Sequence, residues 1–336
     1  MYKILTEADK IEKKEWSTFV DNHINGNFYQ SPDFYDFMSA TPGADPFVIS
    51  IKYKSNLIAI LVGVHFYSTG LLKVFTQRAI VFGGPLIAQN HVEDVLPIVL
   101  EHIQKKVNAI YIEFRNLFQV SKPEIFENTG YKYQPYLNYI IDLSAGSQKI
   151  FENLKSEKRR QIRKAVKHGV KIEIAQNLEE VKDLYQIFES LYMEKVKKPL
   201  PTYSFFKNFY LKLQRNNAGV VLVLKKDNRI IGGSFNPLYK NRIIYDWYRA
   251  GDDKNYKKCY PSTLAAWAGI DYGLTKGYKV FDFMGAGRKD EMYGVRDFKS
   301  QFNGELVEYG RYLKVTKPFF YKIGKTGINF LTKRKK

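Results

Sequence analysis

Cysteine is almost absent from this chain, and Cys259 therefore has no partner for an internal disulfide. The five histidines are scattered, and none stands with the cysteine at the spacing of a zinc site. No apolar run approaches the ~20 residues needed to cross a bilayer. The first residues become charged too early for a signal peptide. We therefore expect a cytoplasmic protein without a disulfide framework or a resident metal ion.

Acidic residues are scarce beside basic ones. The sequence has 53 Lys and Arg against 34 Asp and Glu, which gives a net charge of +19. Such an excess attracts polyanions, so RNA, an anionic membrane and a phosphate-bearing substrate are all candidate partners. A basic surface that is only solvated is the simpler alternative. Hydrophobic residues make up 45% of the 336 residues, which is enough apolar surface for two globular domains of ~150 residues each.

The order of predicted elements repeats between the two halves of the chain. In each half, hairpin strands lead to a helix and then to a strand that carries an acid, Glu113 or Asp282. This order predicts an α/β protein with mixed sheets flanked by helices. We place the boundary in the small, polar stretch 143–148. The predicted domains are residues 1–146 and 147–316, followed by a basic amphipathic tail, 317–336.

A dense run of basic residues opens the second half. Arg159, Arg160, Arg163, Lys164 and Lys167 fall on one stripe of a predicted helix, and Gly169 is suited to ending it. The apolar residues of the same helix are expected to dock on the protein; they are Leu154, Ile162, Ala165 and Val166. The stripe indicates contact with phosphate or RNA, although most basic runs are solvated faces. The tail, with apolar residues among many lysines, could contact an anionic membrane or pack on its own domain.

Taken together, the order of elements and four stretches resemble the Fem family of peptidoglycan-bridge aminoacyltransferases. The stretches are "FYQSPDFYDF" (28–37), "VFGGPLI" (81–87), "KSEKRRQIRKAVKHGV" (155–170) and "FDFMGAG" with "GVRDFKSQFNG" (281–304). The resemblance implies two tandem acetyltransferase-like (GNAT) domains. It also implies transfer of an amino acid from aminoacyl-tRNA to an amine of a peptidoglycan precursor. Phe298 and Lys299 match the Phe-Lys pair that lines the family's acceptor and acyl channel.

The chain also departs from the family's pattern. The segment 177–220 has no room for the long helical arm of the staphylococcal-type members, so the chain resembles the armless ones. Near Met38 the family often has a lysine, and near Ala88 it often has an acid. These departures leave the acceptor open.

The sequence offers residues for acyl transfer to an amine. No Ser-His-Asp or Cys-His arrangement is evident, which favours direct attack without a covalent intermediate. We assign to Lys299 the stabilisation of negative charge at the reacting carbonyl or an adjacent phosphate. The candidates for a general base are Glu113, Asp246 and Asp282, each an acid within an apolar strand. The alternative for these acids is a structural ion pair, Glu113 with Arg115 or Asp246 with Arg249.

We expect further residues to contact the substrates. Tyr248 could form an aromatic wall with Tyr245 and Trp247, or all could belong to the core. The residues predicted to bind substrate are Phe298, Arg159, Arg160, Arg163, Tyr248, Asp282, Arg288 and Arg296.

The donor is the last question that the sequence raises. Acetyl-CoA enzymes of this fold bind pyrophosphate with a Gly-rich turn at a helix N-terminus. The corresponding segment, 250–263, has no Gly-x-Gly, although Lys257 and Lys258 could supply charge instead. We therefore predict an aminoacyl-tRNA-dependent transferase without a bound cofactor, acting on a cell-envelope precursor. The alternatives are an acyl-CoA-dependent N-acyltransferase and a noncatalytic RNA- or membrane-surface-binding protein.

Overall fold

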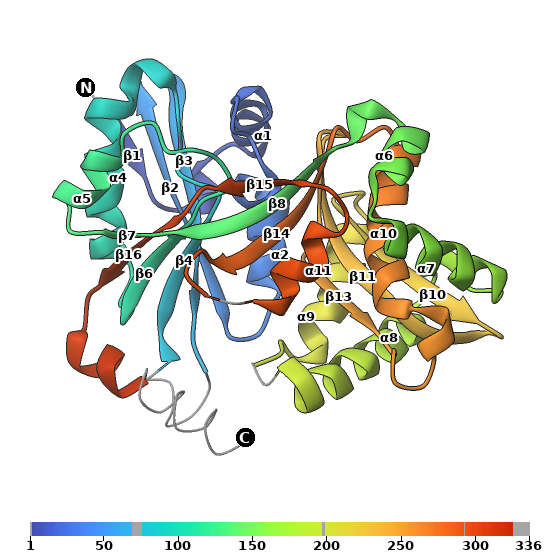
Figure 1. Cartoon of the computed structure of the whole chain (residues 1–336). Helices are drawn as coiled ribbons and strands as arrows, with labels where there is room; N and C mark the ends of the chain where they lie inside the picture. Colours follow the sequence, from blue (N-terminus) through green and yellow to red (C-terminus); the bar gives the residue numbers. More distant parts are fainter. Residues whose placement is uncertain (1, 69–75, 197–198, 292, 325–336) are drawn as a thin grey trace. The chain divides into compact units, whose positions relative to one another are not determined.

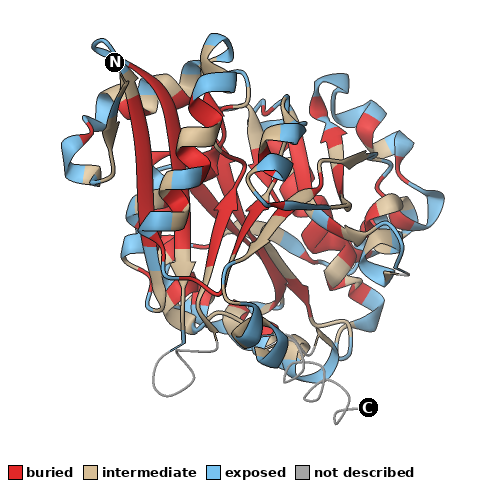
Figure 2. Cartoon of the chain, turned by 90° about the vertical axis from the view of Figure 1, so that its left-hand side faces the viewer, coloured by how far each residue is buried: buried red, intermediate tan, exposed pale blue. Residues whose placement is uncertain are grey.

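The computed structural model describes residues 2–68, 76–196, 199–291 and 293–324. The chain forms two compact units (Figure 1). The first consists of Met1–Pro135 together with Glu308–Lys336, and the second of Tyr136–Val307. Each unit is built on an eight-stranded sheet, and buried apolar residues of strands and helices form its core (Figure 2).

The sheet of the first unit has the order β1-β2-β3-β4-β6-β16-β7, with β5 paired to β3. Its strands are β1 (Tyr2–Leu5), β2 (Ala44–Tyr53), β3 (Asn56–Phe66), β4 (Arg78–Phe82), β5 (Leu86–Ile87), β6 (Tyr111–Arg115), β7 (Lys132–Gln134) and β16 (Arg311–Val315). Its helices include α1 (Lys13–Asn22), α2 (Pro32–Ser39), α4 (Val92–Lys106) and α5 (Pro123–Asn128). β4 and β6 are parallel, as expected for strands joined by a helical crossover.

The sheet of the second unit has the order β15-β8-β14-β12-β11-β10-β9, with β13 paired to β11. Its strands are β8 (Tyr136–Asp142), β9 (Lys171–Ile174), β10 (Gly219–Lys226), β11 (Arg229–Tyr239), β12 (Ile243–Tyr245), β13 (Tyr248–Gly251), β14 (Val280–Arg288) and β15 (Glu305–Glu308). Its helices include α6 (Ser147–Asn153), α7 (Ser156–Lys167), α8 (Leu178–Leu191), α9 (Tyr203–Asn208), α10 (Pro261–Thr275) and α11 (Gly294–Ser300). Here β12 and β14 form the parallel pair across the α10 crossover.

The compact units divide the chain differently from the predicted domains. β8 precedes the predicted boundary after residue 146, yet it pairs with β14 and lies between β14 and β15 in the second sheet. β16 lies in the segment predicted for the second domain, yet it is inserted between β6 and β7 of the first sheet. Each sheet therefore takes one strand from the other half of the sequence. Strand pairing at this separation leaves no local sequence signal.

Two of the stretches quoted above pack against each other in the first unit. Gln30 is fully buried, and its side chain donates to the carbonyls of Val62 (3.1 Å) and Phe82 (2.7 Å) and accepts from the Val62 amide (2.8 Å). It thereby satisfies backbone groups where the chain leaves β4 beside β3. A Cβ on Gly84 would lie only 2.5 Å from the Gln30 amide carbon, so glycine is required there.

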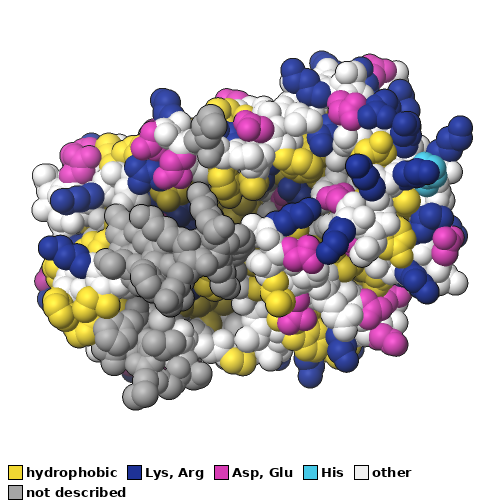
Figure 3. Space-filling view, turned by 60° about the horizontal axis from the view of Figure 1, so that its bottom comes forward, with side chains coloured by type: hydrophobic (Ala, Val, Ile, Leu, Met, Phe, Trp, Pro, Cys, Tyr) yellow, Lys and Arg dark blue, Asp and Glu magenta, His cyan; other side chains and the backbone are white. Residues whose placement is uncertain are grey.

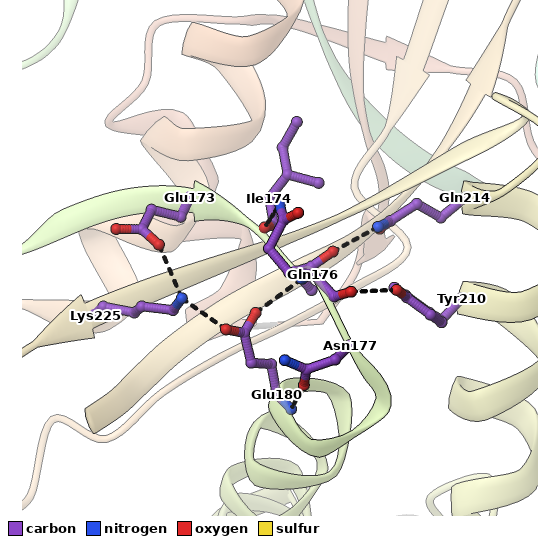
Figure 4. A network of polar contacts seen from close by, with 9 residues as sticks. Glu173, Ile174, Gln176, Asn177, Glu180, Tyr210, Gln214 and Lys225 are labelled. Carbon is purple, nitrogen blue, oxygen red and sulfur yellow. Dashed lines mark hydrogen bonds and ion pairs between the residues drawn. The ribbon is translucent and has the colours of Figure 1, made fainter. Parts of the chain in front are cut away.

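A polar network fixes the start of α8 in the second unit (Figure 4). Asn177 caps the helix by accepting from the Glu180 amide at 2.9 Å. Lys225 of β10 bridges Glu173 of β9 (2.8 Å) and Glu180 (2.7 Å). Tyr210 donates to the carbonyl of Gln176 at 2.6 Å from the π-helical segment Phe209–Gln214. The network ties α8 and the segment after α9 to the edge of the sheet.

Two predictions about the ends of elements can be compared with the structure. α7 ends at Lys167, and Gly169 has a φ of +77°, which confirms its role at the end of the helix. Residues 318–324 of the predicted tail are helical, and residues 325–336 lie outside the described residues. Every helix that the structure describes is too short or too polar to span a bilayer.

Candidate functional site

Lys299 lies on α11 and is buried, with only 6% of its surface exposed. Its ammonium donates to the backbone carbonyls of Phe283 (2.5 Å) and Gly285 (2.8 Å). Both carbonyls come from an irregular part of β14, where Met284 has a φ of +58°. A left-handed residue other than glycine is strained, and such strain is frequent at functional sites. An ammonium has three N–H donors, so these contacts leave one for a ligand.

The negative charges of two buried carboxylates attract this ammonium. Asp282 of β14 is 3% exposed and accepts from the Met284 amide at 2.7 Å. Asp246 is 7% exposed and occupies the irregular step between β12 and β13, where its amide donates to the Asp282 carbonyl at 2.9 Å. Lys299 is attracted to both carboxylates. Asp246 and Asp282, two of the predicted acids, thus lie together with Lys299.

The environment shifts the pKa of two of these groups toward neutrality. Burial lowers the pKa of Lys299 to about 8, and the nearby carboxylates only partly oppose this effect. Burial raises the pKa of Asp282 to about 6, against the opposing effects of the Met284 amide and Lys299. An acid and a base with such values can both exchange protons near neutral pH.

Arg249 completes the group of charges. Its guanidinium forms an ion pair with one carboxylate oxygen of Asp246 and lies over the rings of Phe283 (5.6 Å) and Phe298 (5.0 Å). The pairing named above as the structural alternative for Asp246 is therefore present. The other oxygen of Asp246, Oδ1, is buried and has no hydrogen-bond partner.

A second buried lysine contacts Phe298. Lys158 of α7 is 5% exposed, donates to Gln161 (3.2 Å) and Thr263 (3.1 Å), and lies 4.4 Å from the centre of the Phe298 ring. Its pKa is lowered, first of all by burial. Phe298 thus holds α11 against α7 and β13 through two cation–π contacts.

The aromatic residues at the end of β12 and after it differ in burial. Tyr245 is 1% exposed and belongs to the core, whereas Trp247 and Tyr248 are only partly buried. Tyr248 packs edge to face against Phe205 and Phe206 of α9, with ring centres 5.5 and 5.2 Å away. Trp247 and Tyr248 therefore pack against α9, and their contact with substrate stays a prediction.

The predicted arginines have partners within the chain. Arg288 forms a two-pronged ion pair with Asp290, at 3.1 Å for each contact, and Arg296 donates to the carbonyls of Arg288 and Glu291. Arg159 donates to backbone carbonyls at the end of α6.

The exposed face of α7 carries Arg160 and Arg163. Arg160 pairs with Glu157 at 2.5 Å, and Arg163 lies over Phe151. Lys and Arg side chains are dense on this side of the second unit (Figure 3). Val166 is 59% exposed, so its predicted docking is wrong; the buried side chain is that of Lys158 instead.

Glu113 belongs to the first unit, where two arginines already engage it. Arg115 contacts one carboxylate oxygen at 2.7 Å, and Arg311 contacts the other at 3.0 Å. Burial alone would raise the pKa of Glu113, but the two guanidinium groups together hold it below its usual value. This arrangement favours the ion-pair interpretation of Glu113 over the general base.

The N-terminus of α10 already holds an anion from the chain itself. Asp253 accepts from the amide of Ser262 (3.2 Å) and from its hydroxyl. A helix N-terminus is a general binding site for anions such as a pyrophosphate. Gly251 allows the end of β13 to lie close to the start of α10, since a Cβ on Gly251 would be 2.2 Å from the Ser262 amide nitrogen.

Sequence reasoning missed Lys158 as a site residue and named Arg249 only as a structural partner. Lys158 stands in a basic run, and its only signal is that it falls on the same face of the helix as Ile162 and Ala165. The capping role of Asp253 gave no signal either, because Ser262 lies nine positions further along the chain.

The described cavities lie away from Lys299. One of about 1070 Å³ lies in the first unit beside α1, and one of about 450 Å³ lies in the second unit near the end of α8. Within the described ranges, His, Cys, Asp and Glu form no group that could hold a metal ion.

Comparisons with known proteins agree with this architecture. Residues 153–300 match the family described as Acetyltransferase (GNAT) domain, and no curated protein matches the chain. Among solved structures, FemX covers 96% of this chain and 99% of its own, with a TM-score of 0.73 and 14% identity. A tandem GNAT protein from the clavulanic acid biosynthesis pathway covers 94% and 98%, with a TM-score of 0.60 and 8% identity.

A further structure, L-PGS from Bacillus licheniformis, covers 94% of this chain and 96% of its own, with a TM-score of 0.57 and 16% identity. The predicted fold class is thus confirmed. The chain has the tandem GNAT-like fold, and residues 153–300 are similar to the acetyltransferase (GNAT) domain family.

Proposed function

We propose that this protein is an aminoacyltransferase that moves an amino acid from aminoacyl-tRNA to an amine of a peptidoglycan or other cell-envelope precursor. The observation that carries the proposal is the buried Lys299 ammonium, held by two backbone carbonyls beside Asp246, Asp282 and Arg249. Burying these charged groups costs folding free energy, so a role of these groups in catalysis explains them better than a role in stability does. The similarity to FemX and L-PGS supports the reaction class.

The residues suit direct attack on an ester. The neutral acceptor amine attacks the ester carbonyl carbon, and the remaining donor of Lys299 stabilises the oxygen that becomes negative. Asp282, with its pKa of about 6, accepts the proton that the amine loses. The new C–N bond replaces the C–O bond of the ester, and the protonated Asp282 returns its proton to the departing ribose oxygen, which leaves as a hydroxyl. Arg249 and Phe298 fix the positions of Asp246 and α11.

The donor assignment rests on the start of α10 and on the exposed face of α7. Asp253 fills the place at the start of α10 where a coenzyme A pyrophosphate would bind, which disfavours that donor. The exposed basic face of α7 supports a polyanionic donor, with Arg160 and Arg163 contacting phosphates. The acyl-CoA-dependent alternative requires Asp253 to move away.

One experiment separates these possibilities. Purified protein is offered charged tRNA, acetyl-CoA or a longer acyl-CoA, each with a peptidoglycan-precursor amine. Of the three donors, we expect only charged tRNA to support turnover. Lys299→Ala should lower the rate with charged tRNA by a factor of about 10²–10³. The exposed Lys276 provides the matched control, since Lys276→Ala should keep full activity. Turnover of acyl-CoA without tRNA would reverse the assignment, and binding of tRNA without any turnover would point to a noncatalytic protein.

A further inference from the structure

Among the buried charges around Lys299, the carboxylate of Asp246 has an oxygen whose burial its contacts do not explain. One of its carboxylate oxygens is paired with Arg249, whereas Oδ1 is buried and accepts no hydrogen bond. The side chain is only 4% exposed. A buried charged oxygen without a donor is costly, so a ligand N–H is expected to complete it. Asp282 differs in that it already accepts from the Met284 amide.

The neighbours of Asp246 indicate which class of acyl donor would carry that N–H group. The charges of Lys299 and Asp246 attract each other, so this cluster holds a positive and a negative group. An α-aminoacyl ester presents the complementary pattern, because its α-ammonium lies one carbon away from the carbonyl whose oxygen becomes negative. A plain acyl group, such as acetyl, has no cation to place against Asp246.

We propose that Asp246 binds the α-ammonium of the transferred amino acid through Oδ1 and so selects donors with a free α-amino group. This inference rests on the proposed function, whose donor it specifies. Arg249 holds the second oxygen and so fixes the orientation of the carboxylate. Oδ1 is closed to solvent in the free chain, so the proposed binding requires side chains above it to move; the partly buried Phe298 ring lies against Arg249.

The test compares two donors that differ in a single group. One is a charged tRNA that the protein uses, and the other is the same tRNA with the α-ammonium replaced by a hydroxyl. A hydrogen bond to a charged group corresponds to about 10- to 100-fold in kcat/KM, so the wild type should prefer the aminoacyl donor by that factor. Asp246→Asn should lower this preference to within about threefold, because the amide carries no charge to attract the ammonium.

Asp282→Asn serves as the matched control within the same cluster. It should slow both donors by similar factors and keep the preference, because Asp282 acts on the acceptor amine. Thermal unfolding of each variant shows whether the fold is retained. If Asp246→Asn slows both donors equally and keeps the preference, Asp246 acts as a general base and the inference is wrong. If the wild type uses neither donor, the proposed function itself fails, and the inference fails with it.

Discussion

At the scale of single residues, the burial of Lys299 and Asp282 determines the pH dependence. Asp282 is in its base form above about pH 6, and Lys299 keeps its proton below about pH 8. The rate kcat should therefore be highest between these values and fall on both sides. Asp282→Asn should remove the acidic limb. Lys299→Arg should move the alkaline limb upward in whatever activity remains, because a guanidinium stays charged. A profile that keeps both limbs in the two variants would contradict these assignments.

Gln30 is the residue on which the first unit depends most clearly. Gln30→Met keeps the volume but leaves the Val62 amide and the Phe82 carbonyl without their partner. Each buried group left unpaired costs about 1–3 kcal/mol, so the free energy of unfolding should fall by about 2–6 kcal/mol in urea titrations. Gln148 is exposed, and its side chain donates to Glu152, so Gln148→Met should change stability by less than about 0.5 kcal/mol. Equal effects of the two changes would show that Gln30 has no special role.

At the scale of elements, α7 has two faces with different tasks. Its exposed arginines can contact phosphates, whereas Lys158 on the inner face contacts Phe298. Replacing Arg160 and Arg163 by glutamine should weaken tRNA binding and make the slope of log K against log salt shallower, by about 0.7–0.9 for each phosphate that the variant no longer neutralises. The value of kcat should stay the same. The control replaces the exposed Lys10 and Lys105 of the first unit. If this control variant weakens tRNA binding as much as the α7 variant does, binding depends only on the net charge of the protein.

The start of α10 is the second element that can be tested. Asp253→Ala removes the acceptor for the Ser262 amide and should cost about 0.5–2 kcal/mol in the free energy of unfolding. Coenzyme A should not raise the thermal midpoint of the wild type, because Asp253 occupies the anion position. A clear rise in that midpoint would show that the helix end accepts a pyrophosphate after all.

At the scale of the whole molecule, the exchange of strands decides which fragments can fold. A fragment 136–307 retains β8 between β14 and β15 and should unfold cooperatively in urea. A fragment 147–307 lacks β8 and leaves main-chain groups of β14 unpaired, so it should not fold. Circular dichroism of the two fragments provides the comparison. Cooperative unfolding of the shorter fragment would mean that β8 is dispensable.

The sequence by itself determined the elements and their order. Strand pairs, the crossover helices and the end of α7 shortly before Gly169 follow from local periodicity and from the backbone freedom of glycine, which a short window records. The order of elements with the quoted stretches led to the tandem fold, and the acids within apolar strands indicated Asp246 and Asp282. The possible ion pairs of Glu113 and Asp246 could be named because their partners are near in sequence.

Only the tertiary structure decided which charges are buried together. Lys158 looks like one more basic residue in a solvated run until α7 packs against Phe298, and Asp253 becomes a cap only when its loop folds back on α10. The exchange of β8 and β16 is likewise invisible along the chain. The physical reason is that burial and hydrogen-bond partners depend on contacts between residues far apart in sequence, whereas propensity and periodicity report only on neighbours.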